Sequence, residues 1–328
     1  MSNILNPYLS IIKKAVDQDP KFTNLNYGTT SDEDYDLSYL KGLRSELHSL
    51  ETLNESIDLV KGMNAPEIQN LSRLGSHPDF AHLKQTQETE SHWILTGFVD
   101  VKKSTQLFNK FTKYTVALIT EGIVKASIFA INLCGGYVHR IQGDGLMVYF
   151  GGKRIEKLQA TKDALKAFSM ISFFVKNDLK DFFEDKGISD IHTRAGLDLG
   201  HNNQVLWLYS GIGNAGEVTT CSLYTSLVPK MQAKAKSNGV VVGQNTVNQL
   251  SNKKYFQMKL RPIWDFEDGR TYNQFDFDWE RYLVDNKLAV QNRYGDLVLN
   301  IGSTSSVLNP TYLEPIAKDS KPYFNLNE

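Results

Sequence analysis

The chain has 328 residues, of which 41% are hydrophobic and 22% are charged, and its formal net charge is −1. This composition predicts a globular protein with one sizeable domain plus appendages, or with two domains. The near-neutral charge excludes the strongly basic footprint of proteins that bind duplex nucleic acid or an anionic membrane surface. We therefore expect neither nucleic acid nor a membrane as a partner.

The cysteine content and the first residues favour a cytoplasmic location. Two cysteines, Cys134 and Cys221, argue against both a disulfide scaffold and a zinc site, and they fit a reducing compartment. The amino terminus lacks the basic region and apolar run of a secretory signal peptide. No stretch is expected to reach the ~20 apolar residues that span a bilayer.

Residues 1–89 are predicted to form a helical extension. Asn6-Pro7 predicts a helix start, with Asn6 as the N-cap and proline in the first turn. A second helix is expected from Asp36 towards Val60, because its apolar residues alternate at spacings of three and four. That helix either packs on its own domain or forms a short dimerising helix. Its apolar residues are Leu40, Leu43, Leu47, Leu50, Ile57 and Val60.

From Trp93 the pattern alternates between strands and helices, after a polar connector over 62–90. The order β-α-β-β-α-β predicts an α+β, ferredoxin-like domain, with a mainly antiparallel sheet and helices on one face. We place this domain at 90–285 and a C-terminal tail at 286–328. The expected strands are 93–100, 137–141, 146–150, 191–199, 204–209 and 239–243, and the expected helices are 104–133, 155–183, 226–236 and one from Asn245.

Two aspartates end apolar stretches that are expected to be neighbouring strands. Asp100 lies in Val-Asp-Val-Lys-Lys-Ser-Thr, and Asp144 lies in Arg-Ile-Gln-Gly-Asp-Gly. A desolvated carboxylate needs a partner, and two of them side by side repel unless a divalent cation lies between them. Taken singly, Asp100 could be a helix cap and Asp144 a turn residue. Together they indicate metal-assisted phosphoryl transfer.

These segments resemble the class III nucleotidyl cyclase catalytic domain over about 93–279. Phe98–Thr105 is similar to the first metal motif of that family, Arg140–Gly151 to the second, and Ile191–Gly200 to the strand that follows. One motif alone would be weak, but three in order form a specific signal.

The resemblance implies a site for a nucleoside triphosphate with two Mg²⁺ or Mn²⁺ ions. Asp100, Asp144 and the carbonyl of Val101 would hold both ions. It also implies that two protomers share each site, so that the chain acts as a homodimer or pairs with another protein. The residues expected near the phosphates are Lys103, Ser104, Thr105 and Arg194, where Lys102-Lys103 replaces the usual glycine and is either phosphate-binding or a solvated surface pair.

The chain departs from the family pattern at four further positions. Arg140 stands where adenylate cyclases carry lysine, and its donor-only fork suits uracil, cytosine or guanine better than the amino group of adenine. Thr219 falls at the second base-reading position, where a hydroxyl does not choose a base. Ser226 and Lys230 replace the Asn and Arg that serve the transition state.

This combination resembles the bacterial pyrimidine cyclases of Pycsar anti-phage systems. The resemblance implies synthesis of cyclic UMP or cyclic CMP, which activates a separately encoded effector. We expect UTP as the substrate, with CTP second. The alternatives are a purine cyclase, guanylate before adenylate, and a catalytically silent nucleotide-binding domain.

Overall fold

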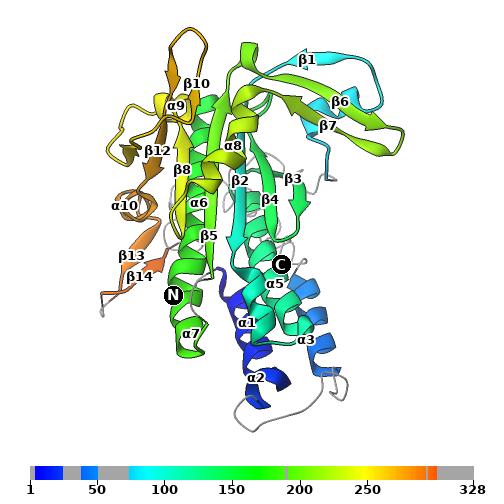
Figure 1. Ribbon diagram of the computed structural model, residues 1–328, viewed down its shortest axis with the longest axis vertical. Helices are drawn as coiled ribbons and strands as arrows, with labels where there is room; N and C mark the ends of the chain where they lie inside the picture. The colour runs from blue at the N-terminus through cyan, green and yellow to red at the C-terminus, as the bar shows by residue number, and fades with distance from the viewer. Residues whose placement is uncertain (1–3, 25–37, 51–73, 189–190, 293–294, 301–328) are drawn as a thin grey trace, which may run out of the picture.

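The computed structural model describes residues 4–24, 38–50, 74–188, 191–292 and 295–300 (Figure 1). Within these residues the main sheet has seven strands in the order β3-β4-β2-β5-β8-β12-β9. Neighbouring strands run antiparallel except β5 and β8, which are parallel. The strands are β2 (Ile94–Lys102), β3 (Tyr137–Gln142), β4 (Gly145–Phe150), β5 (His192–Gly200), β8 (Gly239–Gly243), β9 (Phe256–Met258) and β12 (Gln274–Phe277).

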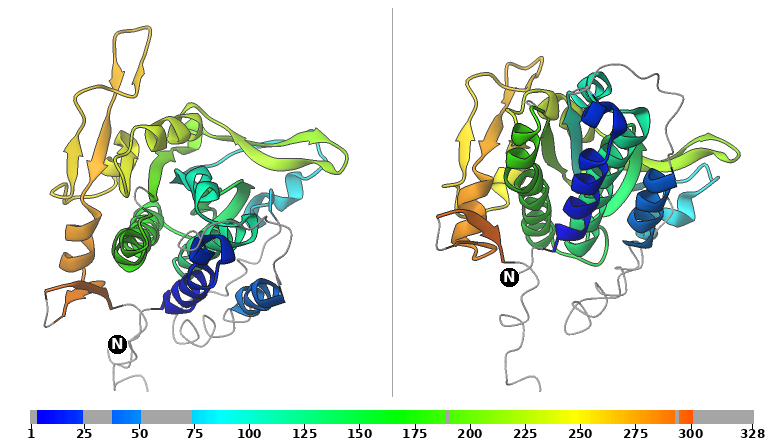
Figure 2. Two further views of the ribbon diagram at one scale, coloured as in Figure 1. Left: turned by 60° about the horizontal axis from the view of Figure 1, so that its bottom comes forward. Right: turned by 90° about the horizontal axis from the view of Figure 1, so that it is seen from below.

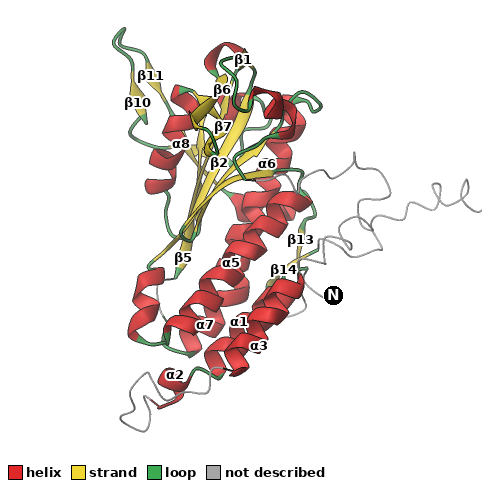
Figure 3. Ribbon diagram, turned by 90° about the vertical axis from the view of Figure 1, so that its right-hand side faces the viewer, coloured by secondary structure: helices red, strands yellow, loops and turns green. Residues whose placement is uncertain are grey.

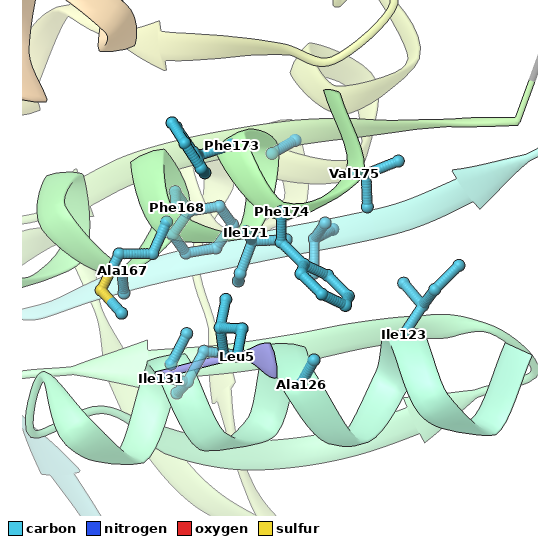
Figure 4. Close-up of a cluster of buried hydrophobic side chains, with 14 of the residues drawn as sticks. Leu5, Ile123, Ala126, Ile131, Ala167, Phe168, Ile171, Phe173, Phe174 and Val175 are labelled. Atoms are coloured by element: carbon cyan, nitrogen blue, oxygen red, sulfur yellow. The ribbon is translucent and has the colours of Figure 1, made fainter. Parts of the chain in front are cut away.

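Helices α5 (Lys113–Leu133) and α6 (Lys157–Phe173) cover one face of this sheet. With β2, β3, β4 and β5 they complete the β-α-β-β-α-β order, so the predicted α+β, ferredoxin-like class is confirmed. Figure 4 shows apolar side chains of the two helices facing each other in the core. Gly97 of β2 is required here, because a Cβ atom would lie 2.4 Å from the Phe168 ring. Helix α6 continues through a π-helical turn (Phe174–Leu179) into α7 (Lys180–Asp185).

Helix α8 (Leu223–Ala233) covers the other face of the sheet, so the expectation that all helices lie on one face was wrong. It approaches β5 so closely that a Cβ atom on Gly196 would lie 2.4 Å from the carbonyl oxygen of Val228. Beside it, β6 (Leu206–Ile212) and β7 (Ala215–Cys221) form a hairpin that extends beyond the body (Figure 1). A second cluster of apolar residues fixes this hairpin over β4, namely Phe80, Leu83, Ile94, Tyr149, Val205, Trp207 and Val218.

Short elements complete the described chain. The β10–β11 hairpin projects from the body (Figure 2). Strands β13 and β14 pair within the expected tail, and their residues Ala289 and Leu299 are buried in the core. The remaining bounds are η2 (Pro78–Leu83), β1 (Thr89–Ser91), η5 (Asn202–Gln204), α9 (Gln244–Asn248), β10 (Trp264–Asp265), β11 (Thr271–Tyr272), α10 (Trp279–Asp285), β13 (Ala289–Gln291) and β14 (Leu297–Leu299).

The amino-terminal helices pack on the same domain. Helix α1 (Asn6–Asp17) lies along α5, where a Cβ atom on Gly122 would lie 2.8 Å from Ile12. Helix α3 (Ser38–Ser49) lies beside it (Figure 3) and buries Leu40, Leu43 and Leu47 in the common core. The described half of the heptad-like helix therefore packs within its own chain; residues 51–60 lie outside the described residues. Helix α2 spans Pro20–Asn24.

Three local predictions were wrong. Helix α1 starts at Asn6 with Leu5 as the N-cap, which makes no side-chain capping bond. The helix expected from Ser104 is instead a six-residue 3₁₀ helix, η3 (Ser104–Asn109), and α5 begins only after Thr112 accepts a capping hydrogen bond from the backbone of Thr115. Strand β7 occupies a segment where no strand was expected.

Helix α5 is long and apolar enough to span a membrane by length and composition, with a mean hydropathy of 1.6. The expectation that no stretch reaches this length was therefore wrong for residues 113–133. Because 67% of that window is buried inside the protein, the helix fits the central core helix of the fold.

The buried Asp19 carboxylate ties the amino-terminal helices to the start of α5. It accepts hydrogen bonds from the backbone and hydroxyl of Thr112, at 3.0 and 2.8 Å, and from the backbone of Phe22 at 2.8 Å. We expect Asp19→Ala to lower the free energy of unfolding by about 3 kcal/mol, because two buried donors and one partly buried donor lose their acceptor. Asp19→Asn keeps one acceptor oxygen and should cost less. Denaturant unfolding measures both, and a loss below about 1 kcal/mol for the alanine variant would refute this role.

Candidate active site

The fold brings Asp100 and Asp144 together at one end of the sheet. Asp100 lies near the end of β2, and Asp144 lies in the tight turn between β3 and β4. A Cβ atom on Gly145 would lie 3.4 Å from Oδ1 of Asp100, so this oxygen faces the hairpin turn. Ser104, the first residue of η3, donates a hydrogen bond to the Asp144 carboxylate. The predicted pair of carboxylates is therefore present, with the Ser104 hydroxyl on it.

The surroundings of Asp144 disfavour its negative charge. Burial, and secondly the Asp100 carboxylate, raise the pKa of Asp144, while the Ser104 hydrogen bond acts in the opposite direction. Oδ2 of Asp144 is buried and has no hydrogen-bond partner among the described residues. A divalent cation would satisfy this oxygen and remove the repulsion between the two carboxylates.

The ligand set suits a hard cation that is shared with phosphate. No group of three or more His, Cys, Asp or Glu side chains converges within the described ranges. Mg²⁺ is typically held by one or two carboxylates plus substrate phosphate oxygens. Asp100, Asp144 and the carbonyl of Val101 therefore fit Mg²⁺ or Mn²⁺ better than Zn²⁺.

Two cationic side chains, those of Lys102 and Arg194, lie near Asp100. Nζ of Lys102 is 3.0 Å from Oδ2 of Asp100, and the Gln232 amide donates to the same oxygen at 3.4 Å. Arg194 lies directly opposite Asp100 on β5 and donates to the carbonyl of Ala233 at 3.2 Å. Its Nε is buried and makes no hydrogen bond within the described chain. Arg194 thus lies on the strand beside Asp100, and its expected contact with the terminal phosphates stays a prediction.

The expected phosphate-binding segment is a tight turn leading into a short helix. Ser104 and Thr105 line one end of a cleft of about 1180 Å³, together with Gly143 and Asp144. The remaining walls of the cleft are formed mostly by α5 and the amino-terminal helices. Because η3 has only six residues, it adds little helix dipole at this point.

Lys103 adopts the backbone conformation that the family's usual glycine would favour at this position. Its backbone is left-handed, with φ 63° and ψ 15°, a conformation that glycine adopts without the Cβ clash. We expect Lys103→Gly to be more stable than Lys103→Ala by about 0.5–1 kcal/mol, although alanine is normally the more stabilising residue. Both variants lose the same charge, so the comparison isolates the backbone. Equal stabilities in denaturant unfolding would contradict the left-handed assignment.

Arg140 is paired with a residue that the sequence patterns did not reveal. Its Nε donates to Oε2 of Glu217 at 2.7 Å, and its Nη2 forms a second ion pair with Oε1 of the same side chain. His139 is buried beside them, and burial followed by the Arg140 charge lowers its pKa to about 3, so it is neutral. Glu217 was missed because β7 was not expected as a strand, and no local motif marks it.

The other expected residues lie on β7 and on the outer face of α8. Thr219, two residues beyond Glu217, lies near the Tyr149 hydroxyl, which forms a hydrogen bond with the neighbouring Thr220 at 3.2 Å. Ser226 and Lys230 are exposed, one turn apart, and Nζ of Lys230 lies 5.0 Å from the centre of the Trp264 ring. In the described part of the chain, neither Ser226 nor Lys230 shares a hydrogen bond or ion pair with the aspartates.

Three curated bacterial proteins named cytidylate cyclase are similar to this chain. One from Staphylococcus aureus is 34% identical over 221 residues, which is 64% of this chain and 52% of the relative. One from Escherichia coli is 30% identical over 278 residues, covering 83% and 57%. A second from Escherichia coli is 30% identical over 183 residues, covering 55% and 40%. The chain thus spans about half the length of the curated relatives it matches.

Among solved structures, the adenylyl cyclase CyaB from P. aeruginosa matches 58% of this chain and 95% of its own, with 17% identity and a TM-score of 0.48. The guanylyl cyclase Cya2 matches 58% and 93%, with 12% identity and a TM-score of 0.48. No protein-family model matches the chain. The sequence comparisons nevertheless confirm the resemblance drawn from the motifs: this chain is a homologue of bacterial proteins curated as cytidylate cyclases.

Proposed function

We propose that this chain is a nucleotidyl cyclase that converts a pyrimidine nucleoside triphosphate, CTP before UTP, to its 3′,5′-cyclic monophosphate and pyrophosphate. The observation that carries the proposal is the carboxylate pair of Asp100 and Asp144, with a buried oxygen that has no partner in the described residues. The names of the relatives support cytidine as the nucleoside.

The reaction is an internal displacement at phosphorus. The ribose 3′-hydroxyl loses its proton, its oxygen bonds to the α-phosphorus, and the bond to the β-phosphate oxygen breaks to release pyrophosphate. Asp100, Asp144 and the carbonyl of Val101 would hold two divalent ions. These ions, when bound, lower the pKa of the 3′-hydroxyl and neutralise the triphosphate.

The chain's own residues would bind and orient the triphosphate. Thr105 lies at the mouth of the cleft beside the carboxylate pair, and its hydroxyl can donate to a phosphate oxygen. Lys103 and Ser104 lie in the same turn. Arg194 would supply charge to the terminal phosphates, and its buried Nε retains an unused donor within the described residues.

We propose further that two copies of the chain complete each site. Ser226 and Lys230 face outward on α8, where a second copy could receive them, and Lys230 would stabilise charge that develops on the phosphates. A lysine in place of the family's arginine retains the cation but loses the bidentate fork.

The Arg140–Glu217 pair bears on the choice of base. UTP was expected because Arg140 could pair with a uracil carbonyl while Thr219 or a neighbour accepts from N3–H, although Arg140 suits cytosine and guanine as well. Glu217 adds an acceptor beside the Arg140 donors. Cytosine offers the matching edge, with its N4 amino group for Glu217 and N3 and O2 for Arg140, whereas O4 of uracil would meet the Glu217 carboxylate. Guanine also offers donors that could face Glu217 and acceptors that could face Arg140, so a guanylate cyclase is the second candidate. Thr219 would then support the base-reading pair from β7.

The product would serve as a second messenger. By resemblance to the pyrimidine cyclases of anti-phage systems, we propose a cytoplasmic enzyme whose cyclic nucleotide activates a separately encoded effector. The catalytic unit would span about 90–285, with 1–89 as a helical extension and 286–328 as a tail. Residues on both sides of these bounds belong to the same apolar core as the catalytic unit.

The test is to incubate the purified chain separately with ATP, GTP, CTP and UTP in the presence of Mn²⁺. Pyrophosphate release and product mass are measured, with the Asp100→Asn/Asp144→Asn double variant as control. A cyclic pyrimidine monophosphate that the variant does not form supports the proposal. A cyclic purine product would retain the chemistry and refute the base assignment, and nucleotide binding without any product would indicate a silent binding domain.

A further inference from the structure

The ammonium group of Lys102 lies against the predicted metal ligand Asp100. The two residues are two positions apart at the end of β2, so their side chains leave the same face of the sheet. Nζ of Lys102 is 3.0 Å from Oδ2 of Asp100. The Asp100 side chain is 19% exposed and that of Lys102 is 37% exposed, so solvent only partly screens the pair.

The two oxygens of Asp100 have different surroundings. Oδ1 faces the hairpin turn that carries Asp144, since a Cβ atom on Gly145 would lie 3.4 Å from it. Oδ2 lies against Nζ of Lys102 and the Gln232 amide. A cation held between the aspartates can use Oδ1, but a cation that uses Oδ2 must displace the ammonium group.

We propose that Lys102 is a built-in counterion that occupies one of the cation positions of the site in the nucleotide-free protein and competes with divalent metal for Asp100. This inference rests on the metal site of the proposed function. The Lys102 charge would reduce the repulsion between Asp100 and Asp144 while the site lacks metal. Entry of metal and triphosphate would then release the ammonium group towards the phosphates.

The neighbouring lysine provides a matched comparison. Lys103 carries the same charge one residue further on, and its side chain is exposed. Its left-handed backbone turns the chain away from the strand direction that Asp100 and Lys102 share. A general effect of positive charge would act from both lysines, whereas direct competition requires Lys102.

The test is a titration of the nucleotide-free protein with Mn²⁺, in which free Mn²⁺ is followed by electron paramagnetic resonance. The proteins compared are the parent chain, Lys102→Met, Lys103→Met and Lys102→Arg. Removing a charge 3.0 Å from a metal ligand should tighten Mn²⁺ binding by about tenfold in Lys102→Met. Lys103→Met should change by less than about threefold, and Lys102→Arg, which retains the charge, should stay close to the parent chain.

A second measurement follows the released ammonium group. Lys102→Met should need less Mn²⁺ for half-maximal turnover, yet show a higher KM for the triphosphate, because the side chain no longer reaches the phosphates. Equal Mn²⁺ affinities in all four proteins would overturn the role of Lys102 and leave the proposed function intact. Equal tightening by both Met variants would also overturn it, in favour of a general charge effect. Absence of Mn²⁺ binding in every protein would overturn the metal site itself.

Discussion

Replacing Asp144 with Asn is expected to abolish turnover while stabilising the metal-free protein. Asn preserves the shape of the turn but removes a charge that a divalent cation needs, so turnover should fall by at least about a thousandfold. In the metal-free protein the same change removes repulsion from Asp100 and the cost of a half-buried charge. The expected gain is about 0.5–1 kcal/mol, because solvent screens part of the interaction.

The stability of the metal-free protein should depend on pH through Asp144. Because the pKa of Asp144 is raised in the folded protein, folding favours the protonated carboxyl. The stability that this group contributes is present below its ordinary pKa of 3.8 and is lost as pH rises through the raised value. Asp144→Asn should therefore lose less stability than the parent chain as pH rises above 3.8 towards neutrality.

Melting temperatures of the metal-free proteins across this pH range measure the effect, and Glu267→Gln, which removes an exposed carboxylate far along the sequence, serves as control. Added Mn²⁺ should raise the melting temperature of the parent chain but not that of Asp144→Asn. An Asn variant that is less stable at every pH, or that retains the Mn²⁺ shift, would contradict the carboxylate-pair account.

Glu217→Gln is expected to change the ratio of CTP to UTP turnover. A carboxylate can only accept a hydrogen bond, so it favours the N4 amino group of cytosine and repels O4 of uracil. The glutamine amide can also donate, which removes that repulsion. The ratio of kcat/KM for CTP to that for UTP should fall by about 10- to 100-fold, the range that one base contact contributes.

Arg140 must be considered in the same experiment, because the two side chains are paired in the free protein. Arg140→Lys keeps the charge but loses the fork, so it should lower turnover of both pyrimidine nucleotides without reversing their order. The comparison variant is Asp265→Asn on the exposed β10 strand. If Glu217→Gln lowered CTP and UTP turnover equally, Glu217 would support folding of the hairpin and not read the base.

The periodic parts of this fold could be predicted from the sequence because long strands and helices repeat their apolar residues regularly. Strands β2, β3, β4 and β5 follow the expected ranges closely, and α6 does so together with the π-helical turn and α7 that continue it. The break before α5 could not be predicted, because it depends on Thr112, whose cap is fixed by the distant Asp19. Such a contact across the sequence leaves no local pattern.

In the candidate site, too, residues in local motifs could be predicted and residues that depend on distant contacts could not. Asp100 and Asp144 were found because each follows an apolar strand and lies in a recognisable motif. Glu217 was not found, because its significance comes from the approach of β7 to Arg140, and β7 is rich in small and polar residues that resemble a loop. The pairing of Lys102 with Asp100 could have been found from the spacing of two along a strand, which places both side chains on one face.

The most direct test of the cyclase assignment is a competition experiment. The purified chain is supplied with an equimolar mixture of ATP, CTP, GTP and UTP with Mn²⁺, and the cyclic products are identified and quantified by mass spectrometry. We expect 3′,5′-cyclic CMP as the main product, formed with an equal amount of pyrophosphate and lost in Asp144→Asn. Linear monophosphates, or no product from any of the four nucleotides, would contradict the assignment.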